Sequence, residues 1–551
     1  MKKSRSKLWM LLVAVVAVAV AAVIVLALGP AAVFTAEASY RDLKCDVVVV
    51  NGRVMDPLTR LDKVATVGIK DGKIVAITSQ PGETQSLRAR AVKVINASGL
   101  IVAPGFINIH GHEGVIRDTL AYGVLDGVTT MIGGNCGSSP YPLANFFTGL
   151  EETGIVANYG TFLGHHTLRA AEGLGPYSTA TPAKIIAMVA RVSAEMEAGA
   201  LGISFGPFYH PMVTYNEMVA LATEAANFGG GASIHTRYAV PYPVPQPPTG
   251  NPKLDLLDVK AIEEAISLAR DADTPLLISH MGGPILGKGS AGMALEMIGS
   301  GLEEGLKLGA DVYTYDYVSV SITHPLFMLP KADLDLVLER IGSVPADWYP
   351  TSDLIIGGQL YMEAFQPFES TDQLLYLRAQ VMAGKLAPFT VCGNAIRSEE
   401  TWLWMNAPFV MLENDAAVAS NPDLGRPAMT GNYSNFFGYW VREKGTLDMM
   451  SALKKTSTMP AQFLGLEDKG SIQVGYDADI VLFNPDTIID TSKMKPGETL
   501  NPPIGIPYVI VNGVLVLENG NSTGAKPGKV IRRTWDIPGY LPGPWNESGE
   551  L

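Results

Sequence analysis

Both ends of the chain show the alternation of apolar and polar residues that is typical of β-strands. Near the N-terminus this pattern runs through CDVVVVNGRVMDP and VATVGIKDGKIVAIT, and the second segment contains Asp71-Gly72, a dipeptide favoured in tight hairpin turns. The pattern returns near the C-terminus in GSIQVGYDADIVLFNP and IPYVIVNGVLVLENG. We therefore predict that residues 39–103 and 466–535 together form one small β-sandwich domain.

The long middle part of the chain alternates short apolar runs with stretches of helical periodicity. In TYNEMVALATEAANFGG, for example, Thr214 and Glu217 have the spacing of a helix capping box. Repeated β/α units of this kind predict a closed parallel sheet, so we expect residues 104–465 to form a TIM-like (β/α)8 barrel. An open, doubly wound α/β sheet is the alternative. The runs assigned to strands are Ile107–His112, Val128–Gly133, Asn158–Gly164, Leu201–Phe205, Gly231–His235, Pro275–His280, Ala310–Tyr315 and Pro408–Asp415.

The gap between the last two predicted strands is much longer than the other gaps. Residues 317–389 fill it, with two segments of helical pattern, HPLFMLPKADLDLVLERIG and ESTDQLLYLRAQVMAGK. An insertion on the catalytic face of a barrel commonly serves as a lid or recognises the substrate. We therefore interpret residues 317–389 as an insertion into the barrel domain.

The first 38 residues have a different character. Four basic residues precede an apolar run from Leu8 to Leu28, which is long enough to span a bilayer. Basic residues on that side favour a cytoplasmic N-terminus, which would place the catalytic part outside. Ala36-Glu37-Ala38 resembles a signal-peptide cleavage site, so a removed signal peptide is the alternative. We expect residues 1–38 to anchor the protein in a membrane, or to direct a secreted or periplasmic protein.

The composition argues against nucleic acid and anionic lipid as partners and against a fold held together by disulfides. The formal net charge is −13, which argues against a surface for nucleic acid or for anionic lipid. There are only three cysteines, an odd number that does not suit a disulfide framework. The expected partner is therefore a small molecule, and the sequence does not predict an oligomeric state.

Residues that bind metals or transfer protons follow the ends of several predicted strands. Two histidines stand two residues apart at the end of the first strand, so their side chains lie on the same face. The carboxyl ends of barrel strands meet at one face, where the chemistry of such folds takes place. Chance would scatter these residue types along the chain. The residues in question are His110, His112, Cys136, His235, His280 and Asp415.

This residue set predicts metal-assisted hydrolysis of an amide. A mixture of histidine and cysteine ligands suits zinc better than magnesium or calcium. Zinc lowers the pKa of a bound water and polarises a carbonyl, and we expect Asp415 to act as the general base. The loop GGNCGSS lacks the lysine of a P-loop, and no G-x-G-x-x-G fingerprint follows a strand.

The order of these motifs resembles the amidohydrolase superfamily. APGFINIHGH, the later histidines, the final aspartate and GSIQVGYDADIVLFNP are the segments that carry this resemblance. Within the superfamily, GVTTMIGGNCGSS, GHHTLR, GALGISFGPFY and GASIHTR are similar to segments of the N-acyl-D-amino-acid deacylases. The match covers the chain from Cys45 to about Arg533.

The resemblance implies roles for individual residues. The tightly held zinc of the deacylases would map onto Cys136, His235 and His280, and a weaker second site onto His110 and His112, with Cys136 shared. The aspartate base maps onto Asp415. A tyrosine that holds the substrate carboxylate maps onto Tyr209, and Lys288 and Arg426 are further candidates for that carboxylate.

Two positions depart from the family pattern. Asn108 stands where the common pattern has aspartate, and Gly282 stands where deacylases usually carry a lysine that contacts the substrate carboxylate. The second departure leaves room for a cyclic-amide hydrolase of the hydantoinase or dihydroorotase type, or for a dipeptide hydrolase. A third alternative is a membrane-tethered binding protein without catalytic activity, against which the complete set of ligands and base argues.

Overall fold

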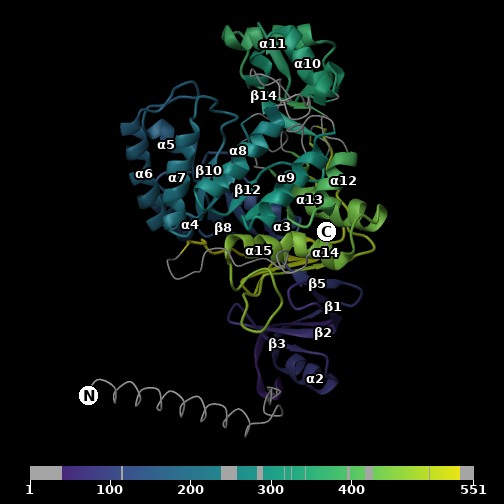
Figure 1. The fold of residues 1–551 in the computed structure, drawn as a ribbon. Helices are drawn as coiled ribbons and strands as arrows, with labels where there is room; N and C mark the ends of the chain where they lie inside the picture. Colours follow the sequence, from purple (N-terminus) through teal and green to yellow (C-terminus); the bar gives the residue numbers. More distant parts are fainter. Residues whose placement is uncertain are drawn as a thin grey trace, which may run out of the picture.

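The computed structural model describes residues 40–112, 116–237, 257–281, 289–315, 317–323, 325–341, 343–393, 398–415, 426–495 and 497–533. An α/β body lies between a β-sheet at one end of the molecule and a helical insertion at the other (Figure 1). No helix among these residues is long and apolar enough to cross a bilayer. The apolar run from Leu8 to Leu28 lies outside the described residues.

One nine-stranded sheet combines the two ends of the chain. Its order is β23-β22-β21-β20-β5-β1-β2-β3, with β4 paired to β1. The ends meet where β20 pairs antiparallel with β5, as in Ile480 opposite Pro104. The described residues form this single sheet and do not establish the predicted sandwich. The strands are β1 (Cys45–Asp56), β2 (Leu61–Lys70), β3 (Lys73–Thr78), β4 (Ala91–Asn96), β5 (Ile101–Pro104), β20 (Ile480–Phe483), β21 (Tyr508–Val511), β22 (Val514–Glu518) and β23 (Asn521–Ser522).

Local sequence explains how this sheet is shaped. Asp71 and Gly72, which join β2 to β3, have φ angles of 51° and 79°, the left-handed conformation that a tight hairpin turn requires. A short 3-10 helix (η1, Tyr40–Asp42) and helix α2 (Pro81–Arg90) accompany the sheet. Leu87 of α2 is buried with Cys45 and Val48 of β1 in a small core of their own.

The body contains consecutive parallel strands, as the repeated β/α pattern predicts. β6, β7 and β8 form one parallel group, and β9, β10, β11, β12, β13 and β19 form another in chain order. Only Phe162 separates β8 from β9, so the two groups follow one another along one stretch of chain. The strands are β6 (Phe106–Asn108), β7 (Val128–Gly133), β8 (Asn158–Thr161), β9 (Leu163–Gly164), β10 (Gly202–Phe205), β11 (Gly231–Ile234), β12 (Leu276–Ile278), β13 (Leu308–Val312) and β19 (Val410–Leu412).

Side chains connect the first and the last of these strands. Asn108 at the end of β6 donates from Nδ2 to Oδ1 of Asn414, at 2.8 Å, and accepts the Asn414 backbone N–H at 3.1 Å. No backbone ladder between β6 and β19 is found among the described residues. The amide at position 108, where the family pattern has aspartate, thus bonds a second amide in the loop after β19.

Helices follow most of the parallel strands and cover them (Figure 1). Thr214 caps α7 by accepting the Glu217 N–H, as predicted, but the Glu217 carboxylate bonds His165 and Arg169 and does not complete a capping box. The helices of the body are α3 (Ile116–Leu125), α4 (Leu143–Thr153), α5 (His165–Ala171), α6 (Pro182–Glu197), α7 (Tyr215–Asn227), α8 (Leu257–Asp271), α9 (Ala291–Glu303), α12 (Ser398–Asn406), α13 (Ala428–Asn435), the π-helices η5 (Phe436–Glu443) and η6 (Lys454–Thr458), α14 (Met449–Leu453) and α15 (Met459–Leu464).

The insertion has its own sheet and its own core. β14 and β15 both pair antiparallel with β18, so the insertion extends to Gly393, beyond the predicted Phe389. Phe327, Trp348 and Leu374 are buried together inside it. Its elements are β14 (Val318–Ser321), η2 (Pro325–Met328), α10 (Lys331–Ile341), η3 (Pro345–Asp347), β15 (Trp348–Pro350), β16 (Leu354–Ile356), β17 (Gln359–Met362), α11 (Thr371–Met382) and β18 (Thr390–Gly393).

Candidate metal centre and active site

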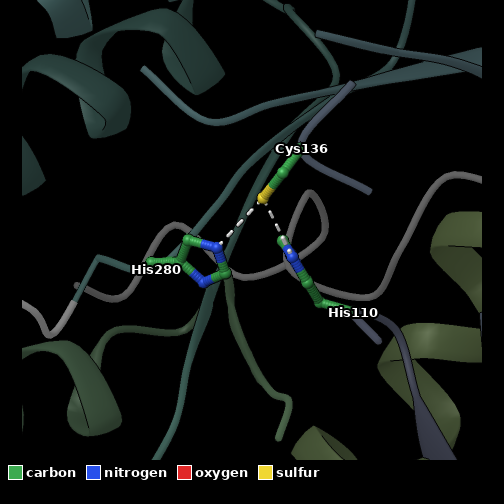
Figure 2. A group of neighbouring side chains, drawn as sticks. All are labelled: His110, Cys136 and His280. Carbon is green, nitrogen blue, oxygen red and sulfur yellow. Dashed lines mark hydrogen bonds between the residues drawn. The ribbon is translucent and has the colours of Figure 1, made fainter. Parts of the chain in front are cut away.

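Cys136 lies at the centre of a group of histidines that come from separate strand ends. Its Sγ is 3.4 Å from Nε2 of His110, 3.4 Å from Nδ1 of His235 and 3.3 Å from Nε2 of His280 (Figure 2 shows two of these contacts). The thiol follows β7, whereas the three imidazoles follow β6, β11 and β12. Three residues that are far apart in sequence therefore direct ring nitrogens at one sulfur atom.

These distances fit a metal ion. In a tetrahedral zinc site, Zn–S and Zn–N bonds of about 2.3 and 2.0–2.1 Å place sulfur and nitrogen ligands roughly 3.6 Å apart. His110, Cys136 and His280 have one ligand atom each within 4.8 Å of one another, and all three are buried. Burial holds the pKa of His110 well below its usual value, so this imidazole is neutral, as a ligand must be. The donor set therefore suits zinc.

A second group of possible ligands adjoins the first. His110, His112 and Asp415 also have one ligand atom each within 4.8 Å of one another. Asp415 Oδ1 is 3.1 Å from His112 Nε2, 3.9 Å from His110 Nε2 and 3.7 Å from His280 Nε2. The base expected from the sequence thus lies beside the ring nitrogens of both groups.

The resemblance implies a tight site of Cys136, His235 and His280 and a weaker one of His110 and His112, with Cys136 shared. Ring nitrogens of His235 and His280 approach the sulfur atom, and so does Nε2 of His110, as sharing of the thiolate requires. The structure therefore brings all six predicted metal and base residues together. Their division into two sites stays a prediction.

Three of these residues have a left-handed backbone. Cys136, His280 and Asp415 have φ angles of 54°, 62° and 38°, which non-glycine residues rarely adopt. The parallel strands also end before the predicted residues, at Ile234, Ile278 and Leu412. The functional side chains therefore lie in the first residues of the loops, where the backbone turns them toward the site.

Two carboxylates contact Nδ1 atoms of the histidines, on the side away from Cys136, and the sequence analysis identified neither. Asp311 Oδ2 is 3.2 Å from Nδ1 of His110, and Glu413 Oε1 is 3.3 Å from Nδ1 of His280. Burial raises the pKa of Asp311 to about 7 and that of Glu413 well above its usual value. Neither acid stood out in the sequence, because the chain has 54 aspartates and glutamates but only 8 histidines and 3 cysteines.

Arg426 is one of the groups that keep the proposed base ionised. Its Nη1 donates to Asp415 Oδ2 at 3.1 Å. Burial alone would raise the pKa of Asp415, but the charges of His280 and Arg426 and the hydrogen bond from His112 hold it well below its usual value. Asp415 is therefore ionised at neutral pH. Burial and the carboxylates Asp415 and Asp311 raise the pKa of the Cys136 thiol well above its usual value.

Aromatic side chains line the same region. Tyr209, in the loop after β10, has its ring centroid 5.0 Å from that of His235, and Phe208 stacks on His235 at 4.9 Å. Tyr313 lies 6.4 Å from His280 by the same measure. Of the three predicted substrate-binding residues, Tyr209 and Arg426 are near the site, and Lys288 lies outside the described residues.

Comparison with known proteins supports an amidohydrolase. Residues 397–517 match the Amidohydrolase family model. The chain is 26% identical over 528 residues to the D-aminoacylase of Alcaligenes xylosoxydans xylosoxydans, covering 89% of this chain and 98% of that one. It is 27% identical over 526 residues to the N-acyl-D-glutamate deacylase of the same organism, covering 90% and 98%.

A solved structure is similar over the same range. The N-acyl-D-glutamate deacylase of Bordetella bronchiseptica, complexed with zinc and a phosphonate that mimics the tetrahedral intermediate, matches with a TM-score of 0.72 at 24% identity. The match covers 89% of this chain and all 100% of that one. The predicted resemblance to the amidohydrolases and their deacylase branch is therefore confirmed, and the structural match shows a shared fold.

Proposed function

We propose that this chain, which resembles the amidohydrolases over nearly its whole length, is a zinc-dependent hydrolase that cleaves the amide bond of N-acyl-D-amino acids. The proposal rests on one observation. Ring nitrogens of three histidines lie 3.3–3.4 Å from the sulfur of Cys136, and the ionised Asp415 lies beside them. The proposal includes closure of the parallel strands into an eight-stranded barrel, which the Asn108–Asn414 bonds support.

Cys136, His235 and His280 would hold the principal ion, and His110 and His112, with Cys136 shared, would hold a second, weaker one. When bound, zinc lowers the pKa of a water molecule and polarises the carbonyl of a substrate. Asp415 accepts a proton from the attacking water at Oδ1 and then delivers it to the leaving nitrogen. When the second site holds no ion, His112 Nε2 can donate to Oδ1, 3.1 Å away, and hold that oxygen in the site.

Arg426 can also bind the carboxylate of the substrate. A guanidinium group carries five N–H donors, so one bond to Asp415 leaves others for the carboxylate of an amino acid. Tyr209, whose ring centroid lies 5.0 Å from that of His235, can donate its hydroxyl to the same carboxylate. Fixing the scissile carbonyl, the carboxylate and the side chain at three separate points is what selects one enantiomer.

The test is a substrate panel. The zinc-loaded protein is incubated with N-acetyl-D-amino acids, their L-enantiomers, dipeptides and cyclic ureides, and release of the amine or ring opening is measured. Cleavage of the D-series supports the proposal. Cleavage of cyclic ureides alone would instead indicate a cyclic-amide hydrolase, and cleavage of dipeptides alone would indicate a dipeptide hydrolase. No turnover in a zinc-replete protein would favour a binding protein.

Tyr209→Phe is expected to lower kcat/KM for N-acetyl-D-amino acids by roughly 10- to 150-fold. Losing one hydrogen bond to a charged carboxylate costs about 1.5–3 kcal/mol. Phenylalanine keeps the ring that packs against His235, so zinc content should not change. Steady-state kinetics with the wild-type protein alongside measure the effect, and an unchanged kcat/KM would remove Tyr209 from the carboxylate site.

We also propose that the catalytic domain lies outside the cytoplasmic membrane. The support is the sequence alone, with basic residues before the apolar run from Leu8 to Leu28. Protease added to intact spheroplasts is expected to degrade the catalytic domain and to spare a cytoplasmic marker protein. Protection of the domain until the cells are lysed would contradict this orientation.

A further inference from the structure

His280 lies between two carboxylates from the same strand end. Glu413 Oε1 is 3.3 Å from its Nδ1, and Asp415 Oδ1 is 3.7 Å from its Nε2. Both acids follow β19, two residues apart. One ring nitrogen of His280 thus faces the protein interior, and the other faces Cys136 at 3.3 Å.

His110 has the same arrangement with a different acid. Asp311 Oδ2 and Ser279 Oγ lie 3.2 and 3.1 Å from its Nδ1, while its Nε2 faces Cys136. A carboxylate at Nδ1 favours the tautomer with hydrogen on Nδ1, because the carboxylate can only accept. The lone pair of each ring then lies on Nε2, on the side of the metal centre.

The two acids differ in how they are hydrogen-bonded. Both oxygens of Asp311 are engaged, since Oδ1 accepts the backbone N–H of His280 at 2.6 Å. Glu413 is fully buried, and its Oε2 has no hydrogen-bond partner among the described residues. Glu413 thus meets the His280 ring through one oxygen, whereas Asp311 bridges the ring of His110 and the backbone of His280.

We propose that Glu413 is the residue that positions His280 on the metal, by holding the Nδ1 side of the ring so that Nε2 is directed at the metal centre. Acids behind metal-binding histidines orient the ring and make it a stronger ligand. The proposal rests on the metal centre of the proposed function but not on the identity of the substrate.

Glu413→Gln tests this role. The amide keeps the size of the side chain, but its NH2 group can donate to Nδ1 and so place the hydrogen on the wrong nitrogen. Affinity of the full-length protein for zinc, measured by competition with a chromophoric chelator, is expected to fall about 10- to 100-fold.

Glu217→Gln is the matched control. Glu217 is another fully buried acid that holds a histidine, with Oε1 2.9 Å from Nε2 of His165, but Arg169 balances its charge. Because His165 does not contact Cys136 in any described interaction, this variant should bind zinc as the wild type does. Its metal-free form should melt at a lower temperature, since it leaves the buried Arg169 without its partner.

The outcomes are distinct. Wild-type zinc affinity in Glu413→Gln would overturn the positioning role. Equal losses of affinity in the Glu413 and Glu217 variants would also overturn the positioning role, because a general loss of packing would then explain both. A wild-type protein that binds no zinc would instead refute the proposed metal centre itself.

Discussion

Asp415→Asn is expected to lower kcat by about 10²- to 10⁴-fold, the usual contribution of a positioned general base. An amide has nearly the same shape as the carboxylate but cannot take up a proton at Oδ1. The change should show in kcat rather than in KM, because it removes an interaction that matters only as the proton moves. Initial rates with an N-acetyl-D-amino acid under saturating zinc measure it.

Asp415→Asn should keep its zinc, since the thiol and the ring nitrogens around it are untouched. Asp126→Asn serves as a control, because Asp126 is also fully buried but accepts the N–H groups of Tyr433 and Ser434, away from the histidines. This control should lose stability and leave kcat within a few-fold of the wild type. Turnover near the wild-type value in Asp415→Asn would show that another group acts as the base.

The hydrophobic pattern was sufficient to predict the positions of the strands but not where each one ends. β7 runs over Val128–Gly133 as predicted, whereas β12 ends at Ile278, two residues before the predicted His280. An apolar run reports burial, and burial continues past the last ladder hydrogen bond into the loop that carries the ligands. The same limitation applies to the two β-rich ends of the chain, whose strands were recognisable although the shape of their sheet was not.

The site could be predicted where a residue type is rare, and not where it is common. Histidine and cysteine are scarce in this chain, so their positions after strands pointed to a centre. Asp311 and Glu413 could not be distinguished in the same way from other acids. Glu217 shows the related error, because its local spacing indicates a capping box while its actual partners, His165 and Arg169, lie far away in the sequence. The roles of such acids depend on contacts with residues that are far away in the sequence.

Cys136→Ser is expected to remove most of the zinc from the purified protein. The sulfur contacts ring nitrogens of His110, His235 and His280, and a serine hydroxyl is a far poorer ligand for zinc than a thiolate. Activity should fall with the metal content and should not recover at moderate zinc concentrations. Elemental analysis after dialysis measures the loss. Cys45→Ser is the control, because Cys45 is buried in the outer sheet and should affect only stability.

The pH dependence of zinc binding tests directly whether the Cys136 thiolate is a ligand. Burial raises the pKa of the Cys136 thiol well above its usual value, and the thiol must lose its proton to bind the metal. Wild-type affinity should therefore increase with pH across pH 7–9, by up to about tenfold per unit for the one proton released. The buried His110 is already neutral there, so it adds nothing to this slope. Cys136→Ser should lose the slope together with the affinity, whereas a variant that keeps both would place the metal elsewhere.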